Sequence, residues 1–287
     1  FQPQAILVRY DVSNTLNTFF GDNSQDRILL GMTEAPALAM QPDNKIVVAG
    51  TRIEAGTGRQ TWGVYRFGEH GATDTTFGGT PAPGTTTLVL GTGNAMPKAM
   101  ALQADGKIVI AGHAYSGTKP VVAVARLNPD GSPDTTFDAD GIALTDFASS
   151  TGAYGRHVTI QSDGRIVVAG LAIIGGVTQV AAVRYNSNGS LDTTFDGDGK
   201  ILTAAPAGWF AEARGVAQAA DGRLVIAASF DQAGGGQFAL IKYLANGALD
   251  ASFGKGGIAT SGVGGGTLHT RGMAMLPSGK FLVGGGA

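Results

Sequence analysis

Apolar residues in this chain are gathered into short runs, and polar turns separate the runs at regular intervals. The clearest run is rich in β-branched residues and follows an Asp-Gly-Lys turn, as in Asp105–Gly112 (DGKIVIAG). Further copies begin at Asp43, Asp163, Asp221 and Ser278. β-Branched residues favour strands, and an Asp-Gly pair between apolar runs is a strong hairpin signal. The basic residue of this turn recurs at positions 45, 107, 165, 223 and 280, so the chain is a repeat protein.

Two other positions follow the same period. A basic residue ends a second apolar run at Arg9, Arg66, Arg126, Arg184 and Lys242, and an aromatic residue follows at Phe20, Phe77, Phe137, Phe195 and Phe253. Each unit then contains four short strands, at 98–103, 107–112, 121–127 and 141–145 in the second copy. Four antiparallel strands per repeat predict an all-β fold, a β-propeller, in which a ring of blades buries the faces that a single blade leaves open.

The first and last units are incomplete in opposite ways. The chain begins with the third and fourth strands of a unit and ends with the first and second. We therefore expect one domain over 1–287, a five-bladed ring. Its blades are 35–92, 97–146, 155–203, 213–261, and a last blade closed by 271–287 together with 1–31. The same halves would also pair between molecules and give a swapped oligomer or a filament, but the closed monomer is favoured.

In four of the five repeats an acidic residue follows the basic residue of the third strand by eight positions. The pairs are Arg66 and Asp74, Arg126 and Asp134, Arg184 and Asp192, and Lys242 and Asp250. A catalytic site is rarely copied into every repeat, whereas a structural contact must be. We interpret each pair as a charge-assisted hydrogen bond that fixes the crossing from the third to the fourth strand.

The repeated pattern resembles a known family. The motif DGK-I-V-V-A-G, followed by A-x-R-Y/L-N-x-D/N-G-S-L-D-T-T-F, is similar to the delta-60 repeats of bacterial propeller-type proteins, with 178–199 as the closest match. The resemblance covers nearly the whole chain, although Asn17 replaces the turn aspartate in the first unit. It implies the propeller fold and an exported or surface protein, and it supplies no activity and no functional residues.

Composition removes several classes of function. The net charge of −2 gives no general attraction to nucleic acid, no cysteine is present for a disulfide or thiolate site, and no apolar run is long enough to span a membrane. The chain begins at Phe1 rather than Met, and only 15% of its residues are charged. Together these features lead us to expect an extracellular or cell-surface protein.

Candidate binding residues gather at the start of the first strand of each unit. Cations occupy one repeat position, at Lys98, Arg156, Arg214 and Arg271. Two residues earlier in the chain stand Tyr154, Glu212 and His269 among others, and Trp209 lies in the loop that leads to the fourth unit. Four cations around one channel mouth would attract an anionic group, such as an acidic sugar or a phosphate. The alternative, which we favour, is that these side chains pair with rim carboxylates.

Two turns carry alternate carboxylates before a glycine, at Asp138 and Asp140 and at Asp196 and Asp198. They lack the further acidic ligands of a calcium loop, so turn chemistry is favoured over a calcium site, and no other metal or cofactor is expected. We therefore expect a non-enzymatic recognition or scaffold propeller of an exported bacterial protein, with a glycan or another anion as its ligand. The alternatives are a structural subunit of a surface layer or filament, and a hydrolase or lyase that uses the rim residues.

Overall fold

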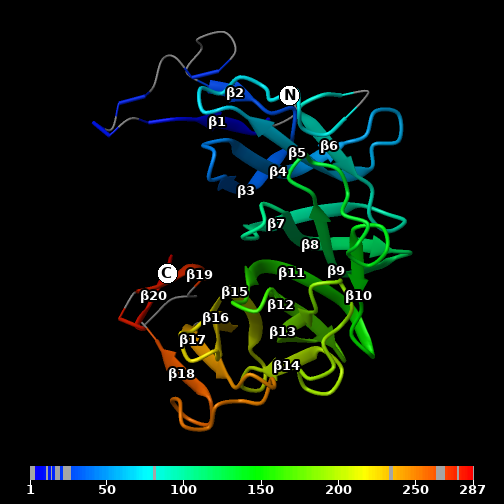
Figure 1. Cartoon of the computed structure of the whole chain (residues 1–287). Helices are drawn as coiled ribbons and strands as arrows, with labels where there is room; N and C mark the ends of the chain where they lie inside the picture. Colours follow the sequence, from blue (N-terminus) through cyan, green and yellow to red (C-terminus); the bar gives the residue numbers. More distant parts are fainter. Residues whose placement is uncertain are drawn as a thin grey trace.

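The computed structural model of the protein describes residues 4–10, 12–13, 15–16, 20–21, 27–79, 82–232, 235–262, 269–276 and 278–286. All its regular elements are β-strands, and they follow one another around an open arc (Figure 1). No described helix has the length and apolar character needed to cross a bilayer.

Four complete sheets of four antiparallel strands form the body of the arc. Sheet 1 contains β3 (Glu34–Met40), β4 (Ile46–Ile53), β5 (Gln60–Phe67) and β6 (Thr85–Leu88). Sheet 2 contains β7 (Ala95–Leu102), β8 (Ile108–Ser116), β9 (Lys119–Leu127) and β10 (Ile142–Thr145). Sheet 3 contains β11 (Ser150–Ile160), β12 (Ile166–Ile174), β13 (Val177–Tyr185) and β14 (Lys200–Ala204). Sheet 4 contains β15 (Phe210–Gln218), β16 (Leu224–Gln232), β17 (Gly235–Tyr243) and β18 (Ile258–Ser261).

Each complete sheet is a simple meander, with its strands paired in chain order. The hairpin between the first two strands of sheet 2 turns at Gly106, whose φ of 84° lies in the left-handed region that glycine adopts readily. The second strand of every complete sheet is buried on both faces over most of its length, which explains its continuous run of Val, Ile and Ala. Antiparallel four-stranded sheets built from the repeat are therefore confirmed.

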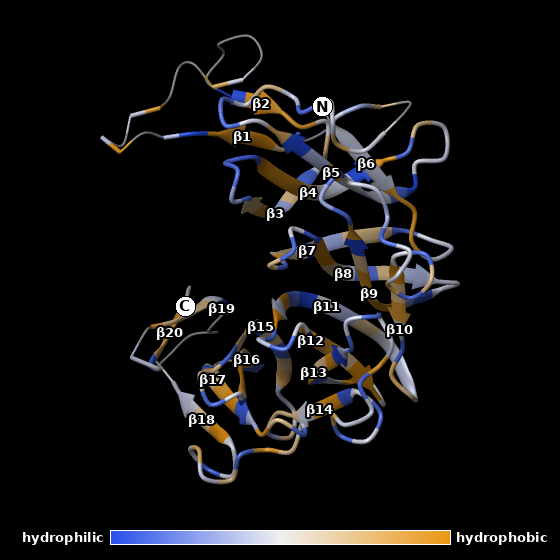
Figure 2. Cartoon of the chain, viewed as in Figure 1, coloured by the Kyte–Doolittle hydropathy of each residue, from blue (hydrophilic) through white to orange (hydrophobic). Residues whose placement is uncertain are grey.

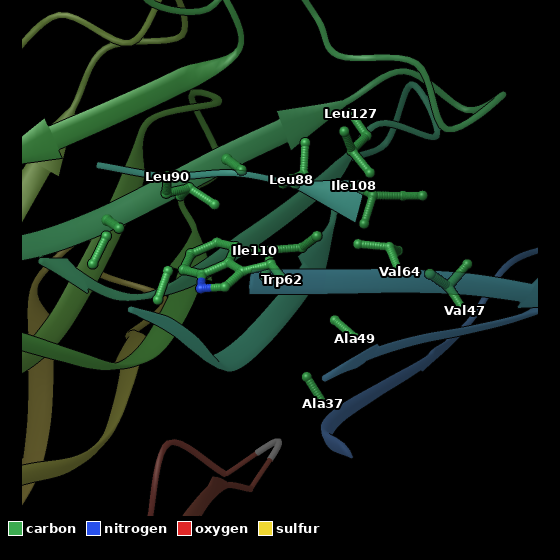
Figure 3. Close-up of a cluster of buried hydrophobic side chains, with 14 of the residues drawn as sticks. Ala37, Val47, Ala49, Trp62, Val64, Leu88, Leu90, Ile108, Ile110 and Leu127 are labelled. Carbon is green, nitrogen blue, oxygen red and sulfur yellow. The ribbon is translucent and has the colours of Figure 1, made fainter. Parts of the chain in front are cut away.

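The hydrophobic core lies between neighbouring sheets, where the apolar strand segments face one another (Figure 2). Between sheets 1 and 2, the Trp62 side chain is fully buried and packs with Ile108 and Ile110 of the next sheet (Figure 3). The aromatic of the repeated turn is buried in the same way, as at Phe77 and Phe137. Each sheet thus depends on its neighbours for the burial of its faces.

The two ends of the chain form separate two-stranded sheets. The N-terminal half-sheet, β1 (Ile6–Val8) with β2 (Arg27–Leu29), packs on sheet 1. The C-terminal half-sheet, β19 (His269–Met275) with β20 (Phe281–Gly286), contacts sheet 4, where Thr270 bonds to Ser229 and Ala228. These half-sheets stand at opposite ends of the arc, and the described residues show no hydrogen-bonded pairing between them (Figure 1). The expected closed ring of five blades is therefore not confirmed.

Candidate functional site

The basic and acidic residues eight positions apart meet beside the turn between the third and fourth strands of each complete sheet. Arg126 Nε donates to Asp134 Oδ2 at 2.7 Å, and both side chains are buried. The contacts between Arg66 and Asp74 and between Arg184 and Asp192 have the same length, whereas Lys242 Nζ lies 3.9 Å from Asp250.

A third residue joins each of these pairs, and the sequence analysis did not assign it there. It is the basic residue of the Asp-Gly-Lys turn. Lys107 Nζ lies 3.2 Å from Asp134 Oδ2, and Arg165 Nε lies 3.0 Å from Asp192 Oδ2. The turn aspartate also accepts hydrogen bonds from the residue two positions later, Thr136 for Asp134. Burial raises the pKa of Asp134, but these hydrogen bonds and the Arg126 charge outweigh it and hold the pKa far below its usual value.

The arginine of each pair also reaches the next sheet. Arg184 Nη1 donates to the carbonyl oxygen of Ala245 at 2.6 Å, and Arg126 Nη1 bonds to the carbonyl of Ser187 in the same way. The guanidinium of Arg184 lies 4.3 Å from the centre of the Phe195 ring, a cation–π distance. One side chain therefore joins its own turn, the buried aromatic and the following sheet.

The candidate cations stand on a repeated backbone irregularity, the β-bulge. In the first strand of each unit the pairing register shifts at the same place, for example between Pro97 and Ala99 and between Gly155 and His157. The residues at the shift in the last four units are Lys98, Arg156, Arg214 and Arg271. A bulge leaves one residue out of the ladder and re-aims its side chain, which explains why these cations share one location.

Rim carboxylates pair with three of the four cations, and two of these pairs cross a junction between sheets. Lys98 Nζ lies 2.8 Å from Glu34 Oε1 of sheet 1. Glu212, only 2% exposed, binds two arginines: Arg156 Nε at 2.5 Å and Arg214 Nη2 at 2.6 Å. Burial raises the pKa of Glu34, but the hydrogen bond and charge of Lys98 outweigh it, and the pKa is lowered. A shared buried carboxylate holds Arg156 and Arg214 in fixed positions.

An aromatic cluster fills the junction between sheets 2 and 3 beside these cations. The Tyr154 ring lies edge-on to the His113 imidazole, with the ring centres 4.9 Å apart, and the Arg156 guanidinium lies 5.6 Å from the Tyr154 ring centre. His113 is 5% exposed, and its Nδ1 has no hydrogen-bond partner among the described residues. Burial, then the charges of Arg156 and Lys98, lower the His113 pKa to about 4. No repeat pattern points to His113, because the other repeats carry other residues at this position.

The remaining candidates lie apart from this cluster or outside the described side chains. Trp209 is half-buried and packs against the core between sheets 3 and 4, while its neighbour Phe210 is exposed. Arg271 is exposed on β19. The side chain of His269 and all of Asn17 lie outside the described part of the chain.

The two candidate calcium turns use carboxylates to cap the backbone. Asp140 Oδ1 accepts the backbone N–H of Ile142 at 2.8 Å, and Asp198 Oδ1 accepts that of Lys200 at 2.9 Å. Asp138 and Asp196 have positive φ values of 47° and 52°. Across the described ranges no three His, Cys, Asp or Glu side chains come together as a metal-binding group. The contacts observed at these four aspartates are those of tight turns.

The repeat segments match a family model described as "Domain of unknown function (DUF5122) beta-propeller". The matches cover residues 41–77, 103–137, 161–195 and 219–253, one for each complete sheet. The chain is a β-propeller repeat protein. Each match runs from the end of a first strand to the buried aromatic of the turn, so it contains the three-residue contact of the propeller. The delta-60 name itself stays a resemblance. A comparison with curated proteins gives no match.

Solved structures of several kinds resemble the propeller. A protein of unknown function from Dyadobacter fermentans is 15% identical, with a TM-score of 0.52, over 98% of this chain and 78% of that chain. The PQQ-bound aldose sugar dehydrogenase of Streptomyces coelicolor is 16% identical, with a TM-score of 0.45, over 99% and 79%. The PorZ surface component of the Porphyromonas gingivalis type-IX secretion system is 11% identical, with a TM-score of 0.44, over 94% and 33%. At these identities the likeness concerns the fold alone.

Proposed function

We propose that the protein is a non-enzymatic recognition module that binds an anionic ligand, such as an acidic glycan, at the bulge face of the propeller. We define this face by Lys98, Arg156, Arg214 and Arg271 on the bulges. The observation that carries the proposal is the bulge itself, which recurs in the first strand of every unit and bears a cation in four of them. Paired carboxylates orient three of these cations but leave the face positive, because Glu34 and Glu212 balance only two charges.

The low charged fraction and the repeat resemblance support an exported, surface-associated setting for this module. The two carboxylates of the described first strands, Glu34 and Glu212, are held in ion pairs with Lys98, Arg156 and Arg214. Binding rather than turnover is therefore the function that these residues favour.

The binding proposal is tested by removing charge without leaving a charge buried alone. The triple variant R156Q/R214Q/E212Q replaces the buried Glu212 and its two arginine partners by neutral glutamines. We expect the wild-type protein to bind acidic glycans on an array, with weaker binding as salt rises, and the triple variant to bind them at least tenfold more weakly. The matched control is K119Q, which removes a cation paired with Asp146 on the outer part of sheet 2. Unchanged binding in the triple variant, or no binding of acidic glycans by the wild type, would refute the proposal.

We also propose that β20 pairs with β1 and completes a fifth blade. In every complete sheet the second and third strands share one register, with these pairs: Val47 and Arg66, Val109 and Arg126, Val167 and Arg184, Val225 and Lys242. The same repeat positions in the half-sheets are Leu282 and Arg9. That register would place Val283 opposite Val8.

Exposed apolar residues on sheet 1 support this pairing. Leu38 and Met40 are 61% and 63% exposed, whereas their counterparts Met100 and Leu102 pack on the core of the preceding sheet. Beside them lies an apolar hollow of about 210 Å³, which Val8 and Leu38 help to line. The inner strands of a closing blade would cover this surface, as sheet 1 covers Met100 and Leu102.

The absence of cysteine makes the closure easy to test. A V8C/V283C variant should form a disulfide under mild oxidation and migrate as a compact monomer. The single variants and an out-of-register V8C/L282C pair serve as controls. A disulfide-linked dimer would show a swapped assembly instead, and no cross-link in a folded protein would refute the pairing.

A further inference from the structure

The junction between sheets 2 and 3 differs from the other junctions on the bulge face. At the repeat position two residues before the bulge, sheets 1 and 4 carry Glu34 and Glu212, but sheets 2 and 3 carry Met96 and Tyr154. The carboxylate that pairs with Lys98 therefore comes from sheet 1, and the one that pairs with Arg156 comes from sheet 4. On the side of this junction, the Arg156 guanidinium lies 5.6 Å from the centre of the uncharged Tyr154 ring.

A polar atom in this junction lacks a partner. His113 crosses the ladder from Met96 and is 5% exposed, and its Nδ1 makes no hydrogen bond to any described residue. A buried polar atom of this kind requires an explanation, such as a ligand or an ordered water. The neighbouring Tyr115 and Tyr154 rings hold the imidazole in place through edge contacts, with ring centres 6.4 Å and 4.9 Å away. The charges of Arg156 and Lys98 act on this buried imidazole, as does the opposing charge of Glu34.

The charge of the surrounding groups limits what would bind there. Lys98, Arg156 and Arg214 are positive, and Glu34 and Glu212 are negative. His113 is neutral near pH 7, as is His157, whose pKa burial and the charges of Arg214 and Arg156 lower to about 4. The group therefore carries one net positive charge. A carboxylate balances this charge, whereas the second charge of a phosphate would remain uncompensated beside Glu34 and Glu212.

We infer that the junction between sheets 2 and 3 binds the carboxylate of a sugar acid, with Lys98, Arg156 and the Nδ1–H of His113 as its donors. This inference rests on the proposed anion-binding function and specifies its ligand. The Tyr154 and Tyr115 hydroxyl groups provide polar partners for the sugar hydroxyls. The protonated Nδ1 tautomer donates to the carboxylate, which satisfies the orphan atom.

The inference is tested with glucuronate, glucose and inorganic phosphate as separate probes, by isothermal titration calorimetry at low salt. The wild-type protein should bind glucuronate, should bind phosphate at least fivefold more weakly, and should not bind glucose measurably. The variant H113F keeps the ring contacts but removes Nδ1, and it should weaken glucuronate binding at least fivefold. Nitrogen NMR of the imidazoles should show the His113 Nδ1 signal shifting on addition of glucuronate. The control H70F changes an exposed histidine of a turn and should leave binding unchanged.

The outcomes separate this inference from the broader proposal. If H113F fails to fold, K98M provides the same test, because the Glu34 side chain that loses its ion pair is 44% exposed and keeps the hydrogen bond from Thr51 Oγ1. Phosphate binding as tight as glucuronate binding would overturn the carboxylate assignment. Undiminished glucuronate binding by H113F, or by K98M in its place, would overturn the placement of the ligand at this junction. If R156Q/R214Q/E212Q nevertheless loses glucuronate binding, the broader anion-binding proposal stays intact. Absence of any anion binding by the wild type would refute both.

Discussion

Removal of Asp134 gives the sharpest test of what holds the blades in place. The carboxylate is 3% exposed and accepts hydrogen bonds from Arg126 Nε at 2.7 Å, Thr136 N at 3.1 Å and Thr136 Oγ1 at 2.7 Å, with Lys107 Nζ at 3.2 Å. In D134A the buried Arg126 guanidinium loses its counter-charge while it stays beneath the Phe137 ring. Breaking a buried ion pair by removing one partner costs about 3–5 kcal/mol of unfolding free energy.

A surface ion pair in the same sheet supplies the matched control. Lys119 Nζ lies 2.6 Å from Asp146 Oδ2, but the two side chains are 30% and 51% exposed. Solvent screens such a pair, so D146A should lose no more than about 1 kcal/mol. The two variants therefore compare the same chemical change at two degrees of burial.

Urea unfolding followed by circular dichroism and by tryptophan fluorescence measures both losses. The midpoint of D134A should fall well below that of D146A with little change in the m-value. In the double variant R126M/D134A, the loss should be smaller than the sum of the two single losses, because no charge is left buried alone. A D134A loss no larger than that of D146A, or strict additivity in the double variant, would refute the assignment of the pair as a structural contact.

Two further predictions concern acid stability and the bulge. In the folded protein the His113 and His157 pKa values lie near 4, below the ordinary 6.5. As the pH falls, the unfolded chain therefore takes up protons before the folded protein does. The free energy of unfolding should decrease between pH 6.5 and pH 4. The loss should be at most roughly 3 kcal/mol per histidine, measured by urea midpoints against pH, and H113F should flatten this slope. G170A places a Cβ only 1.8 Å from the Tyr154 carbonyl oxygen and should lower the melting temperature by several degrees. G235A, with open space around the new Cβ, should change it little, and equal effects of both would argue against the close approach.

The sequence predicted the parts of the fold that every repeat must copy. Continuous runs of Val and Ile marked the buried second strands because both faces of those strands pack against neighbouring sheets. The spacing of Arg126 and Asp134 marked a contact because both residues recur together. The part that Lys107 plays in that contact could also have been predicted from the sequence, because the basic residue of the turn recurs with the same period as Asp134.

Other features had no such signal. A cation recurs at the bulge, as at Lys98, but a recurring basic residue does not by itself indicate a change of hydrogen-bond register. The pairing of Lys98 with Glu34 depends on how neighbouring sheets are rotated, and the two residues come from different units. His113 occurs in one repeat only, so the comparison between repeats that found the other positions gave it no weight.

The direction of the arginine contacts bears on how such a protein changes size. Arg126 bonds forward to Ser187, and Arg184 bonds forward to Ala245, at equivalent turns. Excision of the 58 residues from 127 to 184 would join Arg126 directly to the turn that follows Arg184, and Ala245 would become its acceptor. Gene recombination between repeats would then shorten or lengthen the arc by whole units and preserve this arginine bond at the new junction.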